Sequence, residues 1–332
     1  MKISVIVRTC NRPDFLEQSL CSVELQTHTD WEVIIFDDGD SVKNFKIVNE
    51  FKKRNPLNLV TYYSSGGDYF LFRNSWILAP RISQGQVMVR LDDDDILDSE
   101  SLSFIDKVFT QTPDLDFAYG SSVLFRDGKL TQLIKTNTPL DFPKSTATWE
   151  GYANGHPYTH PWRFKEDVYD EPRHISSIIH ASKLNKICVF HPYMMRTKSI
   201  LNVLDRVTIT SNFVDDLEFL GSLDNLGLRF NKVEKILSYV RKHDEGQVTE
   251  RDKEIQGTTL RQDILKIRDK VDELRPDGLD FQSNVVDINV DGNFNNGLNG
   301  ELQSRFDSLT KTISARLNPE STFSEKFDWR LF

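Results

Sequence analysis

The stretch Val87-Met-Val-Arg-Leu-Asp-Asp-Asp-Asp-Ile-Leu97 decides how the rest of the chain is interpreted. Its first five residues, VMVRL, predict a buried strand, and four aspartates, Asp92 to Asp95, follow where that strand would end. Open α/β sheets bind ligands at the carboxyl ends of their strands. Four adjacent carboxylates need a counter-charge, because like charges a few ångströms apart disfavour joint ionisation. Mg²⁺ or Mn²⁺, which take oxygen ligands, would supply it, whereas the alternative is a solvated acidic turn.

Upstream of the aspartates, apolar runs that predict strands alternate with segments that predict helices. The expected strands are Ile3–Val7, Trp31–Phe36 and Leu59–Tyr63, and the expected helices run from about Asp14 to Gln26, Val42 to Lys53 and Tyr69 to Ile82. This alternation predicts an α/β fold with a mostly parallel sheet, whose strands end along one edge. The second strand also ends in acid, at Asp37-Asp38-Gly39-Asp40, so the two acidic loops should converge.

Downstream of the aspartates the pattern changes to α+β. Ser99 can cap a helix that runs to about Gln111, and an Asp127-Gly128 pair predicts a hairpin between Phe117–Phe125 and Leu130–Ile134. Residues 135–184 lose periodicity and are rich in Pro, His and aromatic residues, which favours a substrate-facing flap or insertion. Further elements are expected in the remainder of this region: a strand Ile187–His191, a helix Asp216–Leu226 and a strand Ile236–Val240.

The C-terminal part of the chain has a helical pattern interrupted by a polar segment. A long amphipathic helix is expected over Leu260 to Leu274, an irregular linker over Asp277 to Gly300, and a last helix from about Glu301 to Leu317. These helices either pack on the main domain or serve as an oligomerisation arm that makes a homo-oligomer.

Composition limits the classes of partner and compartment. The chain has 332 residues and a formal net charge of −9, which argues against a general surface for nucleic acid or anionic membrane but leaves room for a local basic patch. Three cysteines without metal-ligand spacing suit a reducing cytoplasm. The first apolar run, Ile3 to Val7, is too short for a signal peptide or a transmembrane segment. We therefore expect a cytoplasmic protein that does not bind nucleic acid.

Five segments follow one known family in order and approximate spacing. They are ISVIVRTCNRPDFLEQSLCSVELQ, WEVIIFDDGD, FRNSWILAP, GQVMVRLDDDDILD and FVDDLEFLGSLDNLG. Over roughly residues 3–245 the chain thus resembles glycosyltransferase family 2, whose GT-A fold is a Rossmann-like α/β sheet flanked by helices. The resemblance implies a nucleotide-sugar-binding half at 1–125, an acceptor-binding half at 126–248 and a helical extension at 249–332.

The resemblance also implies that the first half binds a nucleoside diphosphate sugar, with uridine or thymidine as the expected nucleoside. Arg8 and Thr9 would border the base pocket, and Asp38 would accept a hydrogen bond from the base. Arg73, in the match to the family's Arg-Asn pair, would contact the base or a phosphate, which suits its planar fork of donors.

The four aspartates match the family's metal motif, with Asp93 at the variable position. The resemblance implies that Asp94 is a metal ligand, that Asp92 contacts the ribose or the metal, and that Asp95 is a second metal-side group. Asp93 is then expected to be expendable. His243, in YVRKHDEG, resembles a histidine that can complete the metal shell, and the alternative is an ordinary surface histidine.

The family places an acidic pair at the start of a helix, and Asp215-Asp216 occupies the matching place. Asp216 is the candidate base that would take the proton from an acceptor hydroxyl, on a glycan or another molecule. A single in-line displacement of this kind inverts the anomeric configuration. The alternative role for the pair is helix capping, because carboxylates are favoured near a helix N-terminus.

Two other functions compete with glycosyl transfer. A metal-dependent nucleotidyltransferase also uses an α/β sheet and acidic ligands, but it would usually have a glycine-rich loop after the first strand, where this chain has RTCNRP. A non-catalytic module that binds a nucleotide or sugar, assembled through the C-terminal helices, is the other alternative.

Overall fold

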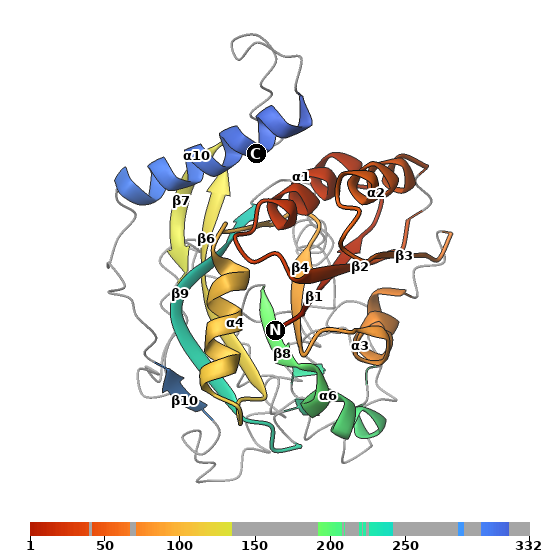
Figure 1. Cartoon of the computed structure of the whole chain (residues 1–332). Helices are drawn as coiled ribbons and strands as arrows, with labels where there is room; N and C mark the ends of the chain where they lie inside the picture. Colours follow the sequence, from red (N-terminus) through yellow and green to blue (C-terminus); the bar gives the residue numbers. More distant parts are fainter. Residues whose placement is uncertain are drawn as a thin grey trace, which may run out of the picture.

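A computed structural model gives the structure of the chain. It describes residues 1–39, 42–66, 71–134, 192–207, 209, 219–220, 222–223, 226–241, 285–288 and 300–318. Helices flank a strongly curved mixed sheet (Figure 1). The strands of this part of the chain are β1 Ile3–Thr9, β2 Trp31–Asp37, β3 Val60–Ser64, β4 Val87–Asp92, β5 Ile96–Leu97, β6 Phe117–Arg126, β7 Lys129–Ile134, β8 Tyr193–Arg196, β9 Phe230–Arg241 and β10 Val285–Ile288. The helices are α1 Pro13–Glu24, α2 Val42–Arg54, α3 Leu71–Ile82, α4 Ser101–Gln111, α6 Thr197–Val203, a 3-10 turn Leu204–Arg206, and α10 Gly300–Leu317.

The strand order in the sheet is β10-β9-β6-β8-β4-β1-β2-β3, with β5 paired to β9 and β7 paired to β6. β1, β2, β3 and β4 run parallel, as the alternation of strands and helices predicts. β8 runs antiparallel to both β4 and β6, so the parallel half of the sheet joins a mixed half at this strand. In the parallel half, the carboxyl ends of β1, β2 and β4 meet at one edge of the sheet.

The central strands are apolar on both faces because helices cover both faces. In β4, Val87, Val89 and Leu91 belong to a core that α1, α2 and α4 cover. Met88, between them, faces a second core, which α3 and α6 cover. Successive side chains of a strand point to opposite faces, so the run VMVRL supplies both cores at once.

The last helix packs on the main domain, which is the first of the two arrangements considered for the C-terminal part. Phe306, Leu309 and Ile313 of α10 are buried against Phe125 and Tyr239. Figure 1 shows α10 lying across the ends of β6 and β7. Residues 260–274 lie outside the described residues.

Three strands differ from the expectation. β10, at Val285–Ile288, pairs in parallel with β9, although Asp277–Gly300 was expected to be an irregular linker. The four residues are mostly β-branched, and their pairing with a distant strand outweighs the surrounding Asn, Asp and Gly. β8 begins at Tyr193, whereas the expected strand Ile187–His191 lies outside the described residues. β9 is also much longer than the expected Ile236–Val240.

Candidate functional site

The acidic run forms a tight turn at the end of β4. The strand stops at Asp92, and the backbone N–H of Asp95 donates to the Asp92 carbonyl oxygen at 3.2 Å. Because this turn breaks the strand, Asp95 does not point away from Asp92 and Asp94, as it would in extended backbone. Carboxylate oxygens of Asp92, Asp94 and Asp95 all lie within 4.8 Å of one another.

The chemistry of this cluster fits a hard divalent cation. It offers three carboxylate oxygens, the ligand type that Mg²⁺ and Mn²⁺ prefer. Asp92 and Asp94 are partly exposed, whereas Asp95 is buried. Burial, followed by the charges of Asp94 and Asp92, raises the pKa of Asp95 well above its usual range. A cation placed among these oxygens would remove that mutual repulsion.

Asp93 is a buried, paired member of the turn, and its expected expendability in metal binding stays a prediction. Arg12 Nη1 lies 3.2 Å from Asp93 Oδ1 and 2.6 Å from Asp94 Oδ2, so one guanidinium joins two neighbouring aspartates. The Thr9 side chain is also hydrogen-bonded to Asp93. Burial raises the pKa of Asp93 to about 7, and the charge of Arg12 only partly offsets this.

A second arginine holds the other side of the turn. Arg241, the last residue of β9, is buried and donates from Nε to the Asp94 carbonyl oxygen at 3.1 Å. Its backbone N–H donates to Asp95 Oδ1 at 3.2 Å. Rings of Phe15 and Phe125 lie 4.6 Å and 4.7 Å from its guanidinium carbon. Burial lowers the pKa of Arg241 to about 10, so it remains a cation at neutral pH.

Sequence reasoning missed Arg12 and Arg241. The sequence holds one general signal, which is that four adjacent carboxylates need counter-charges. That signal indicates a metal ion or basic side chains, but it does not indicate which basic residues. Arg12 stands eighty residues before the turn and Arg241 far after it, so the fold alone brings them to the aspartates.

The residues expected at the base pocket lie at the ends of β1 and β2. Arg8 Nη2 is 3.7 Å from Asp92 Oδ1, which connects the expected base pocket to the acidic cluster. Thr9 ends β1 and is fully buried. Asp38 is buried, and its Oδ1 accepts a hydrogen bond from the backbone N–H of Leu71 at 2.7 Å. Asp38 therefore fixes the first residue of α3, in addition to any role in recognising a base.

Asp37, beside Asp38, is a structural carboxylate. It accepts hydrogen bonds from the Gly39 N–H at 2.8 Å, Asn44 Nδ2 at 2.9 Å and the Tyr62 hydroxyl at 2.6 Å. Burial and the hydrogen bond to Asp37 raise the pKa of Tyr62. A Cβ on Gly39 would lie 2.7 Å from the Asn11 backbone nitrogen, so this turn also requires glycine.

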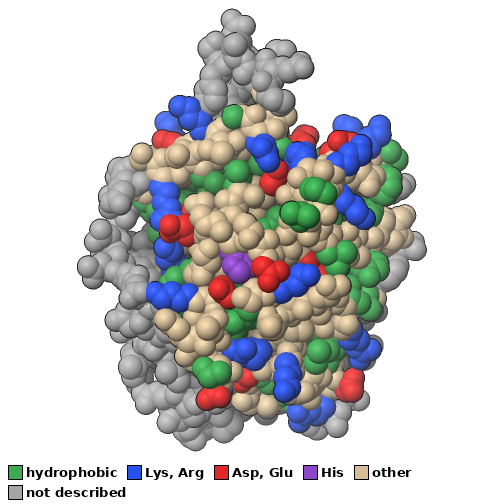
Figure 2. Space-filling model, viewed as in Figure 1, with side chains coloured by type: hydrophobic (Ala, Val, Ile, Leu, Met, Phe, Trp, Pro, Cys, Tyr) green, Lys and Arg blue, Asp and Glu red, His purple; other side chains and the backbone are tan. Residues whose placement is uncertain are grey.

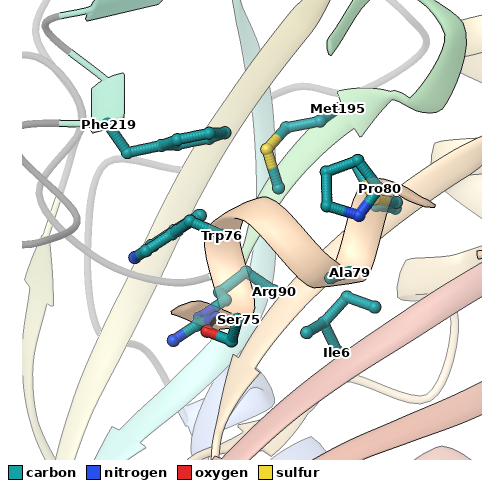
Figure 3. A pocket seen from close by; sticks show the side chains of 9 residues that line it. Ile6, Ser75, Trp76, Ala79, Pro80, Arg90, Met195 and Phe219 are labelled. Atoms are coloured by element: carbon teal, nitrogen blue, oxygen red, sulfur yellow. Dashed lines mark hydrogen bonds between the residues drawn. The ribbon is translucent and has the colours of Figure 1, made fainter. Parts of the chain in front are cut away.

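A stack of three side chains lies on the α3 side of β4. Trp76 stacks on Phe219 with ring centroids 4.4 Å apart and planes at 22°. The guanidinium carbon of Arg90 lies 4.3 Å from the Trp76 ring centroid, and Arg90 Nη1 donates to Ser75 Oγ at 3.1 Å. Figure 3 shows these side chains around a small cavity of about 10 Å³, which Met195 and Pro80 also line. Phe219 follows Asp216 by three residues.

Three expected site residues have no described side chain. Arg73 belongs to α3, but its side chain lies outside the described part of the structure. Asp216 and His243 also lie outside the described residues. β9 ends at Arg241, two residues before His243.

The curved sheet, the parallel strands that form one half of it and the acidic cluster at the end of β4 define an α/β protein with the GT-A fold. Among solved structures, residues 1–349 of TarS from S. aureus match with a TM-score of 0.50 and 15% identity, over 73% of this chain and 60% of that one. The match shows the same fold. The family model described as "Glycosyl transferase family 2" matches residues 4–171, and the chain belongs to this family.

The relatives support the family assignment, but each match covers only part of the relative's length. An uncharacterized glycosyltransferase, alr2836, from Nostoc sp. is 31% identical over 116 residues, which are 35% of this chain and 34% of the relative. A poly(ribitol-phosphate) beta-glucosyltransferase from Bacillus spizizenii is 32% identical over 106 residues, 31% of this chain and 16% of that protein. The chain thus spans about a third of the first relative.

None of the helices in the described ranges is long and apolar enough to cross a bilayer.

Proposed function

We propose that the protein is an inverting glycosyltransferase that moves a sugar from a nucleoside diphosphate to an acceptor hydroxyl with the help of Mn²⁺ or Mg²⁺. We propose a uridine or thymidine diphosphate as carrier. The observation that carries the proposal is the cluster of Asp92, Asp94 and Asp95, whose oxygens approach within 4.8 Å at the edge where such sheets bind ligands. Membership of the family supplies the reaction class.

On the donor side, Asp92, Asp94 and Asp95 would hold the cation, with His243 as a further candidate ligand. When bound, such a cation stabilises the negative charge that develops on the departing diphosphate. Arg8, 3.7 Å from Asp92, adds a positive charge at the same edge, and Arg73 is a further candidate for phosphate or base. Arg12 and Arg241 hold the turn in shape, so that the three carboxylates need not move to meet the donor.

On the acceptor side, Asp216 is the proposed base. Its carboxylate would take the proton from the acceptor hydroxyl as that oxygen forms a bond to the anomeric carbon and the bond to the diphosphate breaks. One displacement inverts the configuration of the sugar. The support for this role is the match of Asp215-Asp216 to the family's acidic pair. In the same proposal, residues 1–125 bind the donor, 126–248 bind the acceptor, and 249–332 form the helical extension.

The names of relatives guide the choice of substrates. One of them is a poly(ribitol-phosphate) beta-glucosyltransferase, so we propose a glycan or polyol phosphate hydroxyl as the acceptor and place glucose-linked donors first in the panel. The comparison covers a small share of that protein, so the panel also holds other hexose and hexosamine donors.

The test begins with thermal stabilisation of the full chain by nucleoside diphosphates and nucleotide sugars, with and without Mn²⁺. We expect one nucleotide to stabilise the protein only when the metal is present. The matching sugar donor is then incubated with acceptors, and the anomeric configuration of the product is read by NMR. Stabilisation without metal would contradict the assigned cation site, and retention of configuration would contradict the single displacement.

Replacement of Asp216 separates the base from the donor site. We expect Asp216→Asn to keep metal-dependent donor binding and to lose at least about a hundredfold in transfer rate, the usual range for a general base. Asp215→Asn is the matched control, because it removes a neighbouring charge from the same pair. Asn caps a helix as well as Asp does, so a purely capping pair would leave both variants active. Retained transfer in Asp216→Asn would therefore contradict its assignment as the base.

A further inference from the structure

Exposed apolar side chains are unevenly distributed over the described part of the chain. Seven large apolar residues there are more than about a third exposed, and five of them fall between positions 42 and 63. These five are Val42, Phe45, Leu57, Leu59 and Tyr63. Tyr63 stacks on Phe36, which belongs to the core under α3, so it faces away from α2 and the other four remain. Leu57 is 97% exposed and Val42 68% exposed. Single exposed apolar residues are ordinary on protein surfaces, but a cluster around one helix indicates an interaction site.

The same segment carries a local positive charge. Residues 42–63 hold five Lys or Arg residues and one acid, Glu50, which gives +4 in a chain whose net charge is −9. Lys53 pairs with Glu50 at 2.6 Å, and Arg54 pairs with Glu24 on α1 at 3.1 Å. Lys43, Lys46 and Lys52 are exposed.

Both kinds of side chain occur on the exposed half of α2. Asn44, Val48 and Phe51 are the buried side of the helix. Val42 and Lys46 are one helical turn apart on the opposite side. A helix of 13 residues is about 20 Å long, and Leu57 lies just beyond its C-terminal end. Figure 2 shows Lys and Arg side chains, with a few acidic ones, interspersed with hydrophobic ones over the part of the surface that Figure 1 assigns to α2 and β3.

The helix dipole accounts for only part of this pattern. Lys52, Lys53 and Arg54 occupy the last turn of α2, where cations are favoured. That effect gives no reason for exposed apolar residues at both ends of the helix. A soluble polyanion would be attracted by the lysines alone. A surface that combines lysines with protruding apolar side chains matches a bilayer of anionic lipid, which offers both negative headgroups and an apolar interior.

We propose that α2 and residues 55–59 form a docking surface for anionic membranes. The lysines attract the headgroups, and Val42 and Leu57 insert between them. Val42 follows Asp38 of the expected base pocket by four residues, whereas Leu57 lies beyond the other end of α2. Vesicle binding is measured without donor or acceptor, so its outcome does not depend on the proposed transfer reaction. It would hold the enzyme at a membrane through reversible contact, without a spanning helix.

The experiment is sedimentation of the full chain with phosphatidylcholine vesicles, with and without phosphatidylglycerol. We expect binding to the vesicles that contain phosphatidylglycerol and loss of that binding as salt is raised. Leu57→Ser and Val42→Ser should each weaken binding several-fold to about tenfold, because each removes an apolar side chain that would leave water. The combined change Lys43→Gln, Lys46→Gln and Lys52→Gln should weaken it about a hundredfold at low salt.

Lys198→Gln and Leu201→Ser on α6 are the matched controls, since both residues are exposed on a helix at the opposite face of the sheet. The proposal fails if the chain does not bind phosphatidylglycerol vesicles, or if the α6 changes weaken binding as much as those on α2. It also fails if the lysine changes abolish binding while Val42→Ser and Leu57→Ser leave it intact, because that result means attraction to any polyanion. Circular dichroism melting of each variant confirms that it is folded.

Discussion

The two acidic turns of the sheet, Asp37-Asp38 after β2 and Asp92 to Asp95 after β4, resemble each other in sequence and differ in surroundings. Asp37 accepts three hydrogen bonds from neutral donors, and Asp38 accepts one from the start of α3. In the β4 turn, carboxylates face one another, and arginines contact the turn from two sides.

The surroundings of a carboxylate distinguish a structural role from a metal-binding role. A buried carboxylate whose oxygens are occupied by neutral N–H and O–H donors stabilises the fold, because those donors would otherwise be unpaired. Carboxylates that approach one another carry an unfavourable repulsion, which a bound cation can relieve. Replacements in the two turns should therefore affect different measurements.

The largest effect is expected in the β4 turn. Asp94→Asn removes one of three clustered carboxylates, so we expect donor binding to lose its metal dependence and transfer to fall roughly 10²–10³-fold. The thermal midpoint should change less than in Asp37→Ala, because the lost ion pair with Arg12 is offset by relief of the repulsion with Asp95 and Asp92. Initial rates over a Mn²⁺ titration and a melting curve are the two measurements. A drop in thermal midpoint without a change in metal dependence would place Asp94 among the structural carboxylates.

The reverse result is expected in the β2 turn. Asp37→Ala leaves the Tyr62 hydroxyl, Asn44 and the Gly39 N–H without their acceptor, so it should lower the free energy of unfolding by about 2–4 kcal/mol. Urea unfolding measures this loss. At a temperature where the variant is folded, the Mn²⁺ dependence of donor binding should match that of the unmodified protein. Loss of metal dependence here would mean that the two turns act as one site.

Asp93 belongs to the ligand turn but is expected to behave as a pH-sensitive structural residue. In the metal-free protein its pKa is raised to about 7 from an ordinary value of 3.8. Between these values the folded chain holds a proton that the unfolded chain has lost, so the free energy of unfolding falls as the pH rises. Asp93→Asn cannot titrate, and it should flatten this decline by at most about 1.4 kcal/mol per pH unit.

Urea unfolding at pH 5 and pH 7 in the presence of a chelator measures the decline. Asp95 is present in both proteins, so the difference between their slopes reports the change made at Asp93. An unchanged slope in Asp93→Asn would mean that Arg12 keeps Asp93 ionised throughout this range.

Sequence alone was enough to predict the parallel half of the sheet, because local patterns specify it. VMVRL has the length and composition of a strand buried on both faces, and the four aspartates mark its end. The family motif brought Asp92, Asp94 and Asp95 together as candidates, and their oxygens do converge. The short strands β8 and β10 escaped prediction because each forms by pairing with distant segments, which no local pattern encodes.

The contacts that distinguish the two turns were also beyond prediction. Both turns are runs of Asp followed by a change of direction, and the sequence gives Asp37 and Asp94 similar surroundings. Arg12, Tyr62 and Arg241 decide which carboxylates are paired with neutral donors and which with cations. Folding brings all three to the turns from segments that are remote in the sequence.

The smallest effect is expected from Tyr62→Phe, which measures how much one of the three donors to Asp37 contributes to the stability of the fold. Tyr62→Phe removes one donor to Asp37 Oδ2, but Asn44 still donates to the same oxygen and Gly39 to the other. The carboxylate therefore remains paired, and the cost should be about 1 kcal/mol, compared with the larger loss in Asp37→Ala. Urea unfolding of Tyr62→Phe, Asp37→Ala and the double variant gives the coupling between the two positions. If Tyr62→Phe alone costs as much as Asp37→Ala, the hydroxyl is the dominant partner, and Asp37 depends on one neutral donor where the β4 turn depends on two arginines.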